Sequence, residues 1–73
     1  MTIGERAYKE VKKAAKEEGI SFTLECLNLG TCHTAVANWR KKNQTPNAHT
    51  LRQMALMGYD VIYILTGVSK DED

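Results

Sequence analysis

The chain has 73 residues, a formal net charge of +1 at neutral pH, 42% hydrophobic residues and 26% charged residues. A chain of this length buries only about 60% of its unfolded surface, so we expect one small domain without a deep active site. The composition is that of a soluble globular protein, with no membrane-spanning apolar run and no signal-peptide core. Cys26 and Cys32 indicate reduced thiols in a cytoplasmic protein, with a disulfide between them as the alternative.

Charge is distributed unevenly along the chain. Residues 1–25 carry five cations and five acids, whereas residues 26–59 carry four cations, two histidines and no acid. Residues 60–73 are acidic, with Lys70 as their cation. An acid-free basic segment suits a polyanionic partner, because a carboxylate would repel phosphate. Four cations are few, so an ordinary solvated helix surface is the alternative interpretation.

Helical spacing runs through the chain, and glycines and one proline separate the helices. The first helix is expected over residues 3–18, ending at Gly19. Its apolar stripe consists of Ala7, Val11, Ala14 and Ala15. A short second helix follows an N-cap at Ser21 or Thr23 and ends at Gly30. Its inner face is expected to hold Leu24, Leu27 and Cys26.

The third helix is expected to start near Cys32 and to run to Lys41 or Lys42. Its inner face consists of Cys32, Val36 and Trp39, which are spaced at i, i+4 and i+7. The opposite face consists of His33, Thr34, Ala37, Asn38 and Lys41. Helical spacing therefore separates an apolar edge, which belongs to the core, from a polar stripe that faces outward.

Two further helices complete the expected bundle. The fourth runs from Ala48 to Met57 behind an Asn47 N-cap, and the fifth runs from 61 to 66 behind an Asp60 cap. Their inner faces are expected to hold Leu51, Met54 and Ala55, and Val61, Ile64 and Leu65. Ile62 and Tyr63 then face outward and are candidate dimer contacts. The prediction is an all-α, compact five-helix bundle over residues 1–67, followed by an acidic, flexible tail over residues 68–73.

A short helix, a tight turn and a second helix with small polar outward residues are typical of a helix-turn-helix. In that motif the second helix enters the major groove of DNA. The residues expected to read base edges are His33, Thr34, Ala37 and Asn38. Those expected to contact phosphate are Thr31, Lys41, Lys42, Asn43, Gln44 and Thr45.

Three stretches of the sequence resemble the lambda-repressor-like helix-turn-helix family, the Cro, phage-repressor or XRE class. They are GTCHTAVANWRKKNQTP, PNAHTLRQMALMGYDV and GYDVIYILTG, which together cover Gly30 to Gly67 in order. The resemblance implies a small prokaryotic or phage transcriptional regulator, repressor-like, that binds an inverted-repeat operator in double-stranded DNA. It implies that His33, Thr34 and Asn38 read bases and that Lys41 to Gln44 approach the backbone. Any dimer would use this domain, through its last helix and tail.

The sequence departs from that family at several positions. Lys42 stands where glycine is usual, which transfers the left-handed conformation to Asn43. Glu25 stands where leucine is usual, and Phe22 where the family has a polar residue that touches phosphate. Ala15 replaces a basic residue near the end of the first helix, for which Lys12, Lys13 or Lys16 could substitute. Otherwise the Lys and Glu residues of this helix are expected to be solvated surface.

The same residues also allow functions other than DNA binding. A protein-interaction module on this scaffold, such as an antitoxin, antirepressor or adaptor, is the main alternative, because fold does not fix function. A zinc site is not expected, because Cys26, Cys32, His33 and His49 lack zinc-ligand spacing. We expect no enzyme activity, no cofactor, no membrane partner and no small-molecule ligand. Trp39 is expected in the core.

Overall fold

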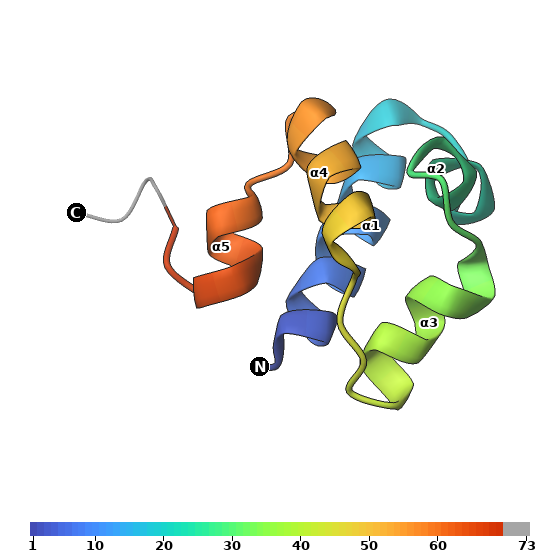
Figure 1. Cartoon of the computed structure of the whole chain (residues 1–73). Coiled ribbons are helices and arrows are strands. Elements are labelled where there is room, and N and C mark those ends of the chain that lie inside the picture. Colours follow the sequence, from blue (N-terminus) through green and yellow to red (C-terminus); the bar gives the residue numbers. More distant parts are fainter. Residues whose placement is uncertain (70–73) are drawn as a thin grey trace.

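The computed structural model describes residues 1–69, which form five helices and no strand. The helices are α1 (Ile3–Glu18), α2 (Phe22–Asn28), α3 (His33–Lys41), α4 (Ala48–Leu56) and α5 (Val61–Thr66). Helix α1 runs through the middle of the bundle, and α2, α3 and α5 each pack against it (Figure 1). The all-α prediction is confirmed. Most of the expected flexible tail, residues 70–73, lies outside the described residues.

Four of the five helices begin at a side-chain cap, and three of these caps were expected from the sequence. The cap residues Thr2, Ser21, Asn47 and Asp60 accept hydrogen bonds from the backbone N–H groups of Glu5, Leu24, Thr50 and Tyr63. Each bond satisfies an N–H group that the helix itself leaves unpaired. The cap of α2 is therefore Ser21, not Thr23.

The core lies where α1 meets the other helices. Its fully or almost fully buried members are Ala7, Val11, Cys26, Leu29, Val36, Trp39, Met54 and Ile64. The α1 stripe supplies Ala7 and Val11 at i and i+4, and α3 supplies Val36 and Trp39. The expected core position of Trp39 is confirmed, with 5% of its surface exposed.

Helix α1 lies close to the end of α3 and to the segment after it at Gly4. A Cβ atom built on Gly4 would collide with the backbone carbonyl oxygens of Trp39 and Gln44. Only glycine fits this contact without a backbone shift, because both obstacles are main-chain atoms. The start of α1 thereby fixes the end of α3 and the segment that follows it.

Arg6 attaches α5 to α1. Its Nε donates to the carbonyl oxygen of Ile64 at 2.9 Å, and its Nη1 donates to that of Met1 at 2.6 Å. The C-terminal carbonyls of a helix lack intrahelical partners and carry partial negative charge, so a guanidinium is well suited to this place. A helix of only six residues is held in position in this way.

The expected inner face of α2 is confirmed at Cys26 and is wrong at Leu24 and Leu27. Leu24 and Leu27 are 44% and 59% exposed, whereas Glu25, Cys26 and Leu29 are fully buried. The helix is turned about its axis relative to the expectation, because the buried Glu25 carboxylate accepts a hydrogen bond from the hydroxyl of half-buried Tyr59. A carboxylate can enter a core when such a donor compensates its lost hydration.

The burial of several residues on the other helices also differs from the expectation. Cys32 is exposed, because it precedes α3 as an extended N-cap residue (φ −131°, ψ 162°), so helical spacing does not apply to it. Ala55 is exposed, and the buried face of α4 holds Thr50 and Met54 instead. The buried face of α5 centres on Ile64. Leu65 is 40% exposed, whereas Tyr63 is half-buried against the core.

Candidate nucleic-acid interface

Helix α3 carries four residues that were expected to read bases. His33 and Thr34 are exposed, and Ala37 and Asn38 are half-buried on the same side of the helix. Their opposite edge, Val36 and Trp39, is buried in the core. The core therefore fixes the rotation of α3, and the polar stripe lies on its outer side.

The segment after α3 brings the expected phosphate contacts together. Lys42 ends the helix at φ −116°, and Asn43 takes the left-handed conformation at φ 53°. The expectation that Asn43 replaces the missing glycine is thus confirmed. Side chains from Lys41 through Thr45 are all exposed, and buried Pro46 anchors the end of the segment. At the other end of α3, half-buried Thr31 donates its backbone N–H to the Cys26 carbonyl at 3.0 Å.

The N-terminus of α3 differs from those of the other helices. Its N-cap residue, Cys32, makes no side-chain capping hydrogen bond. The backbone N–H groups of the first turn consequently lack a side-chain acceptor there, and they carry the positive end of the helix dipole. Such an end favours an anion such as phosphate.

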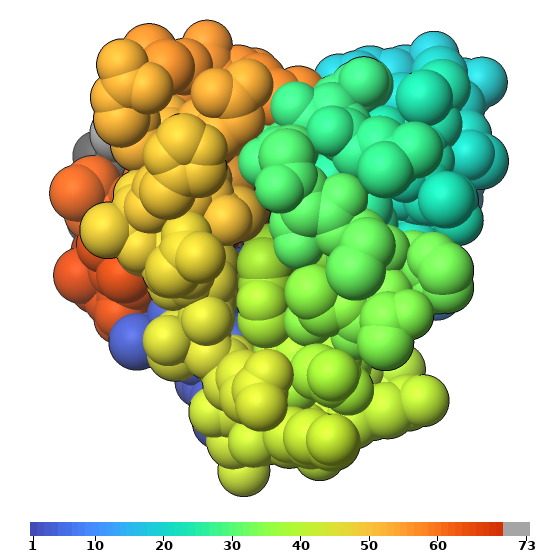
Figure 2. All heavy atoms as spheres, turned by 45° about the vertical axis from the view of Figure 1, so that its right-hand side comes forward, coloured from blue at the N-terminus to red at the C-terminus, as the bar shows by residue number. Residues whose placement is uncertain are grey.

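These segments share one face of the molecule. In Figure 2 the green and yellow segments, which include α3 and the connection from α3 to α4, fill the centre of the face shown. They belong to the acid-free part of the sequence, residues 26–59. Its four cations, Arg40, Lys41, Lys42 and Arg52, are all exposed. The face therefore combines basic and hydrogen-bonding side chains without a carboxylate from these segments.

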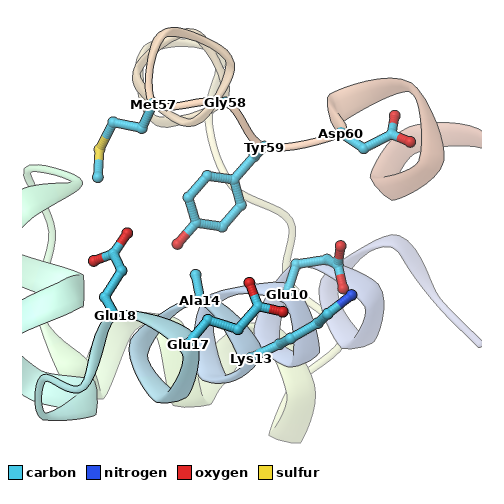
Figure 3. A pocket seen from close by; sticks show the side chains of 9 residues that line it. All are labelled: Glu10, Lys13, Ala14, Glu17, Glu18, Met57, Gly58, Tyr59 and Asp60. Carbon is cyan, nitrogen blue, oxygen red and sulfur yellow. The ribbon is translucent and has the colours of Figure 1, made fainter.

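The acids gather elsewhere, around a pocket of about 290 Å³ between α1 and the connection from α4 to α5. Its lining includes Glu10, Glu17, Glu18 and Asp60, together with Lys13, and the Tyr59 ring points into it toward α1 (Figure 3). No residue of α3 lines this pocket. The four acids of this pocket therefore lie apart from α3, which contributes no side chain to it.

A hydrogen-bonded pair of buried Glu25 and half-buried Tyr59 supports α2. The Tyr59 hydroxyl donates to Oε2 of Glu25, which links α2 to the connection between α4 and α5. Burial and the Glu25 carboxylate raise the pKa of Tyr59 well above its usual range, so the hydroxyl stays protonated. Burial also raises the pKa of the neighbouring Cys26 thiol to about 11. Cys26 is therefore a neutral core residue at physiological pH.

Sequence reasoning missed two further cations beside α3, and it gave Arg40 no separate role. Lys9 and Lys12 of α1 and Arg40 of α3 line a second pocket, together with Tyr8 and Glu5. The lysines of α1 were interpreted as solvated surface, and Lys12, Lys13 or Lys16 as a substitute for the basic residue that Ala15 replaces. The sequence does indicate a basic side of this helix, because Lys9, Lys12 and Lys16 are spaced at i, i+3 and i+7 and share one side of it.

The candidate dimer contacts lie apart from this face, on α5. Ile62 is 54% exposed, whereas Tyr63 is half-buried, so Ile62 is the residue that stands fully outward. Leu65 and Val68 add exposed apolar surface near it along the chain.

The described residues were also compared with other kinds of site and with known proteins. Within residues 1–69, no three His, Cys, Asp or Glu side chains come close enough together to hold a metal ion. None of the five helices has the length and apolar character needed to span a membrane. No protein-family model matches the chain, and no match was found among curated proteins or solved structures.

Proposed function

We propose that this chain is a sequence-specific double-stranded DNA-binding protein, a small transcriptional regulator with a lambda-repressor-like helix-turn-helix. The observation that carries the proposal is the outer side of α3. It presents His33, Thr34 and Asn38 on a surface formed by segments that contain no acid. An α-helix fits the major groove, and these residue types match its donors and acceptors.

In the proposed complex, α2, the turn and α3 act as the helix-turn-helix. Asn38 bonds adenine through its amide, His33 and Thr34 contact base edges, and Ala37 lies against a thymine methyl group. The fixed rotation of α3 supports this assignment, because Val36 and Trp39 hold the opposite edge in the core.

Phosphate contacts supply most of the affinity in this proposal. Lys41, Lys42 and the polar residues through Thr45 bind the backbone on leaving the groove, and the uncapped start of α3 binds a second phosphate. Each neutralised phosphate releases counterions, so the affinity falls steeply with salt.

A homodimer would place two copies of α3 in successive major grooves, about 34 Å apart. We assign the contact to α5, whose Ile62 and Leu65 expose apolar side chains. An inverted-repeat operator is the DNA counterpart of this two-fold symmetry.

The proposal is tested by binding to random-sequence duplex DNA at low and at moderate salt. A DNA-binding protein gives measurable affinity at low salt and a linear fall of log affinity with log salt concentration. If neither affinity nor a salt slope is found, the proposal is wrong.

One observation favours a second candidate, a protein-interaction module. Leu24 and Leu27 are exposed on α2, next to the turn that precedes α3. Exposed apolar side chains on a small domain are typical of a protein contact when they form a continuous patch. Substituting both leucines by serine would weaken binding to a protein partner and leave the salt slope on DNA unchanged.

A further inference from the structure

A second basic site lies between α1 and α3, and every residue that lines it except Arg40 is outside the segment from which the DNA interface was predicted. It is a pocket of about 390 Å³ lined by Glu5, Tyr8, Lys9, Lys12 and Arg40. Its cations come from two helices, so it exists only in the folded domain.

Aromatic contacts organise the cations of this pocket. The Arg40 guanidinium carbon lies 5.4 Å from the centroid of the Tyr8 ring, and the Lys12 Nζ lies 6.0 Å from it. The Tyr8 ring is itself held by Phe22, with ring centroids 5.5 Å apart and planes at 55°. Cation–π contact restrains both long side chains, so less conformational entropy remains to be lost when a ligand binds.

The pocket carries an excess of positive charge. Glu5 is its acid, and the Glu5 carboxylate accepts a hydrogen bond from the backbone N–H of Thr2 in the capping box. Among the described residues, neither a hydrogen bond nor an ion pair engages Lys9, Lys12 or Arg40. Three cations are therefore available to an anion.

Arg40 connects this pocket to the outer side of α3. His33, Ala37 and Arg40 are spaced at i, i+4 and i+7, so they lie along one edge of the helix. A DNA strand that follows this edge of the occupied groove would pass the pocket. Phe22, which stands where the lambda-repressor-like family usually has a polar residue that touches phosphate, supports the ring that holds Arg40.

We propose that the pocket between α1 and α3 binds a phosphate group of the DNA backbone beside the groove that α3 occupies. The inference rests on the proposed DNA-binding function. Arg40 contacts two phosphate oxygens through its planar fork, and Lys12 and Lys9 act as flexible point charges. Tyr8 is a positioning residue, because its ring keeps the guanidinium in place.

The test measures the salt slope of binding to random-sequence duplex DNA for Lys12→Ala and Arg40→Ala. Each variant should reduce the slope by about 1 and weaken binding about equally on all sequences. Lys13→Ala is the matched control, since it removes the same charge from the same helix but lines the acidic pocket with Glu10 and Glu17. The control should leave the slope almost unchanged.

Two more variants test the role of the ring. Tyr8→Leu should reduce the slope as Arg40→Ala does, whereas Tyr8→Phe, which keeps the ring, should behave as wild type. Circular dichroism must show that Tyr8→Leu is folded. If Tyr8→Leu is unfolded, Arg40→Ala and Arg40→Lys are compared instead. Lysine keeps the positive charge, so Arg40→Lys should retain the wild-type salt slope, whereas Arg40→Ala should reduce it.

The outcomes separate this inference from the proposed function. If Lys42→Ala lowers the slope but Lys12→Ala and Arg40→Ala do not, the pocket proposal is overturned and DNA binding stands. If the wild-type chain shows no slope, both are overturned. An NMR titration with inorganic pyrophosphate distinguishes a DNA backbone phosphate from a small phosphate ligand as the occupant of the pocket. Shifts at Tyr8 and Arg40 with pyrophosphate but not with DNA would assign the pocket to a small phosphate ligand, contrary to the proposal.

Discussion

The hydroxyl of Tyr59 donates a hydrogen bond to the buried carboxylate of Glu25, across 34 residues of sequence. This contact fixes which side of α2 faces the core, and α2 in turn packs against α3. Among the described residues, the other Glu25 oxygen, Oε1, has no hydrogen-bond partner. The Tyr59 hydroxyl is therefore the contact that compensates the desolvation of Glu25.

Tyr59→Phe should destabilise the fold by about 1–3 kcal/mol, because it leaves Glu25 without its donor. Replacing both members, Glu25→Leu with Tyr59→Phe, should recover most of that loss, since an apolar pair needs no hydrogen bond. Urea denaturation of the two single variants and the double variant measures the coupling. Additive losses in the double variant would show that the two side chains do not depend on each other.

The Glu18 carboxyl should destabilise the fold at neutral pH. Desolvation, and then the neighbouring Glu25, raise the pKa of Glu18 above its ordinary value of 4.5. The folded state therefore binds this proton more tightly than the unfolded state. The stability that this tighter proton binding gives the folded state is present at acidic pH and is lost as the pH rises through the folded-state pKa of Glu18.

Glu18→Gln should consequently be more stable than wild type at pH 7, and this difference should shrink toward zero as the pH falls below about 4.5. Glu10→Gln is the control, because it removes a charge from the same helix and the same pocket. Thermal melts of the three proteins across this pH range test the sign. A gain for Glu18→Gln that persists unchanged in acid would contradict it.

Gly4→Ala should destabilise the fold by about 1–3 kcal/mol, through a backbone shift at the carbonyls of Trp39 and Gln44. The sign is diagnostic, because helix propensity alone would make alanine more stable by about 1 kcal/mol. Chemical denaturation gives the free energy of unfolding. A stabilised variant would mean that α1 and α3 are not in close contact at this point.

The left-handed residue after α3 gives another prediction on stability. Asn43→Ala should cost about 1 kcal/mol, whereas Asn43→Gly should be neutral or slightly stabilising, because the position has φ 53°. Equal stabilities for the alanine and glycine variants would contradict this conformation.

Two substitutions should separate affinity from specificity. Lys42→Ala should weaken binding about equally on all DNA sequences and reduce the salt slope by about 1, whereas Asn38→Ala should relax the preference at one base pair. Fluorescence anisotropy on a selected site and on its single-base variants measures both effects. Wild-type behaviour of both variants would mean that α3 is wrongly oriented in the proposal.

Local signals in the sequence were enough to predict most of the secondary structure. The bounds of α1, the caps at Asn47 and Asp60, and the role of Asn43 follow from residues within one or two turns of each position. These features depend on hydrogen bonds between near neighbours, which residue type and spacing specify.

Features that depend on distant residues could not be predicted in the same way. The inner face of α2 depends on Tyr59, and the need for glycine at position 4 depends on the carbonyls of residues 39 and 44. The pocket at Arg40 likewise needs Lys12 and Tyr8 from another helix. The exposed stripe of α3 was predicted, because it lies on one helix, whereas the basic pocket beside it was not.

In vitro selection from random-sequence duplex DNA tests the central claim most directly. The wild-type chain should enrich a short inverted repeat whose half-sites lie about one helical turn apart, and Asn38→Ala should lose the preference at one position in each half-site. Failure of the folded wild-type chain to enrich any motif would contradict the claim that the outer side of α3 reads a DNA sequence.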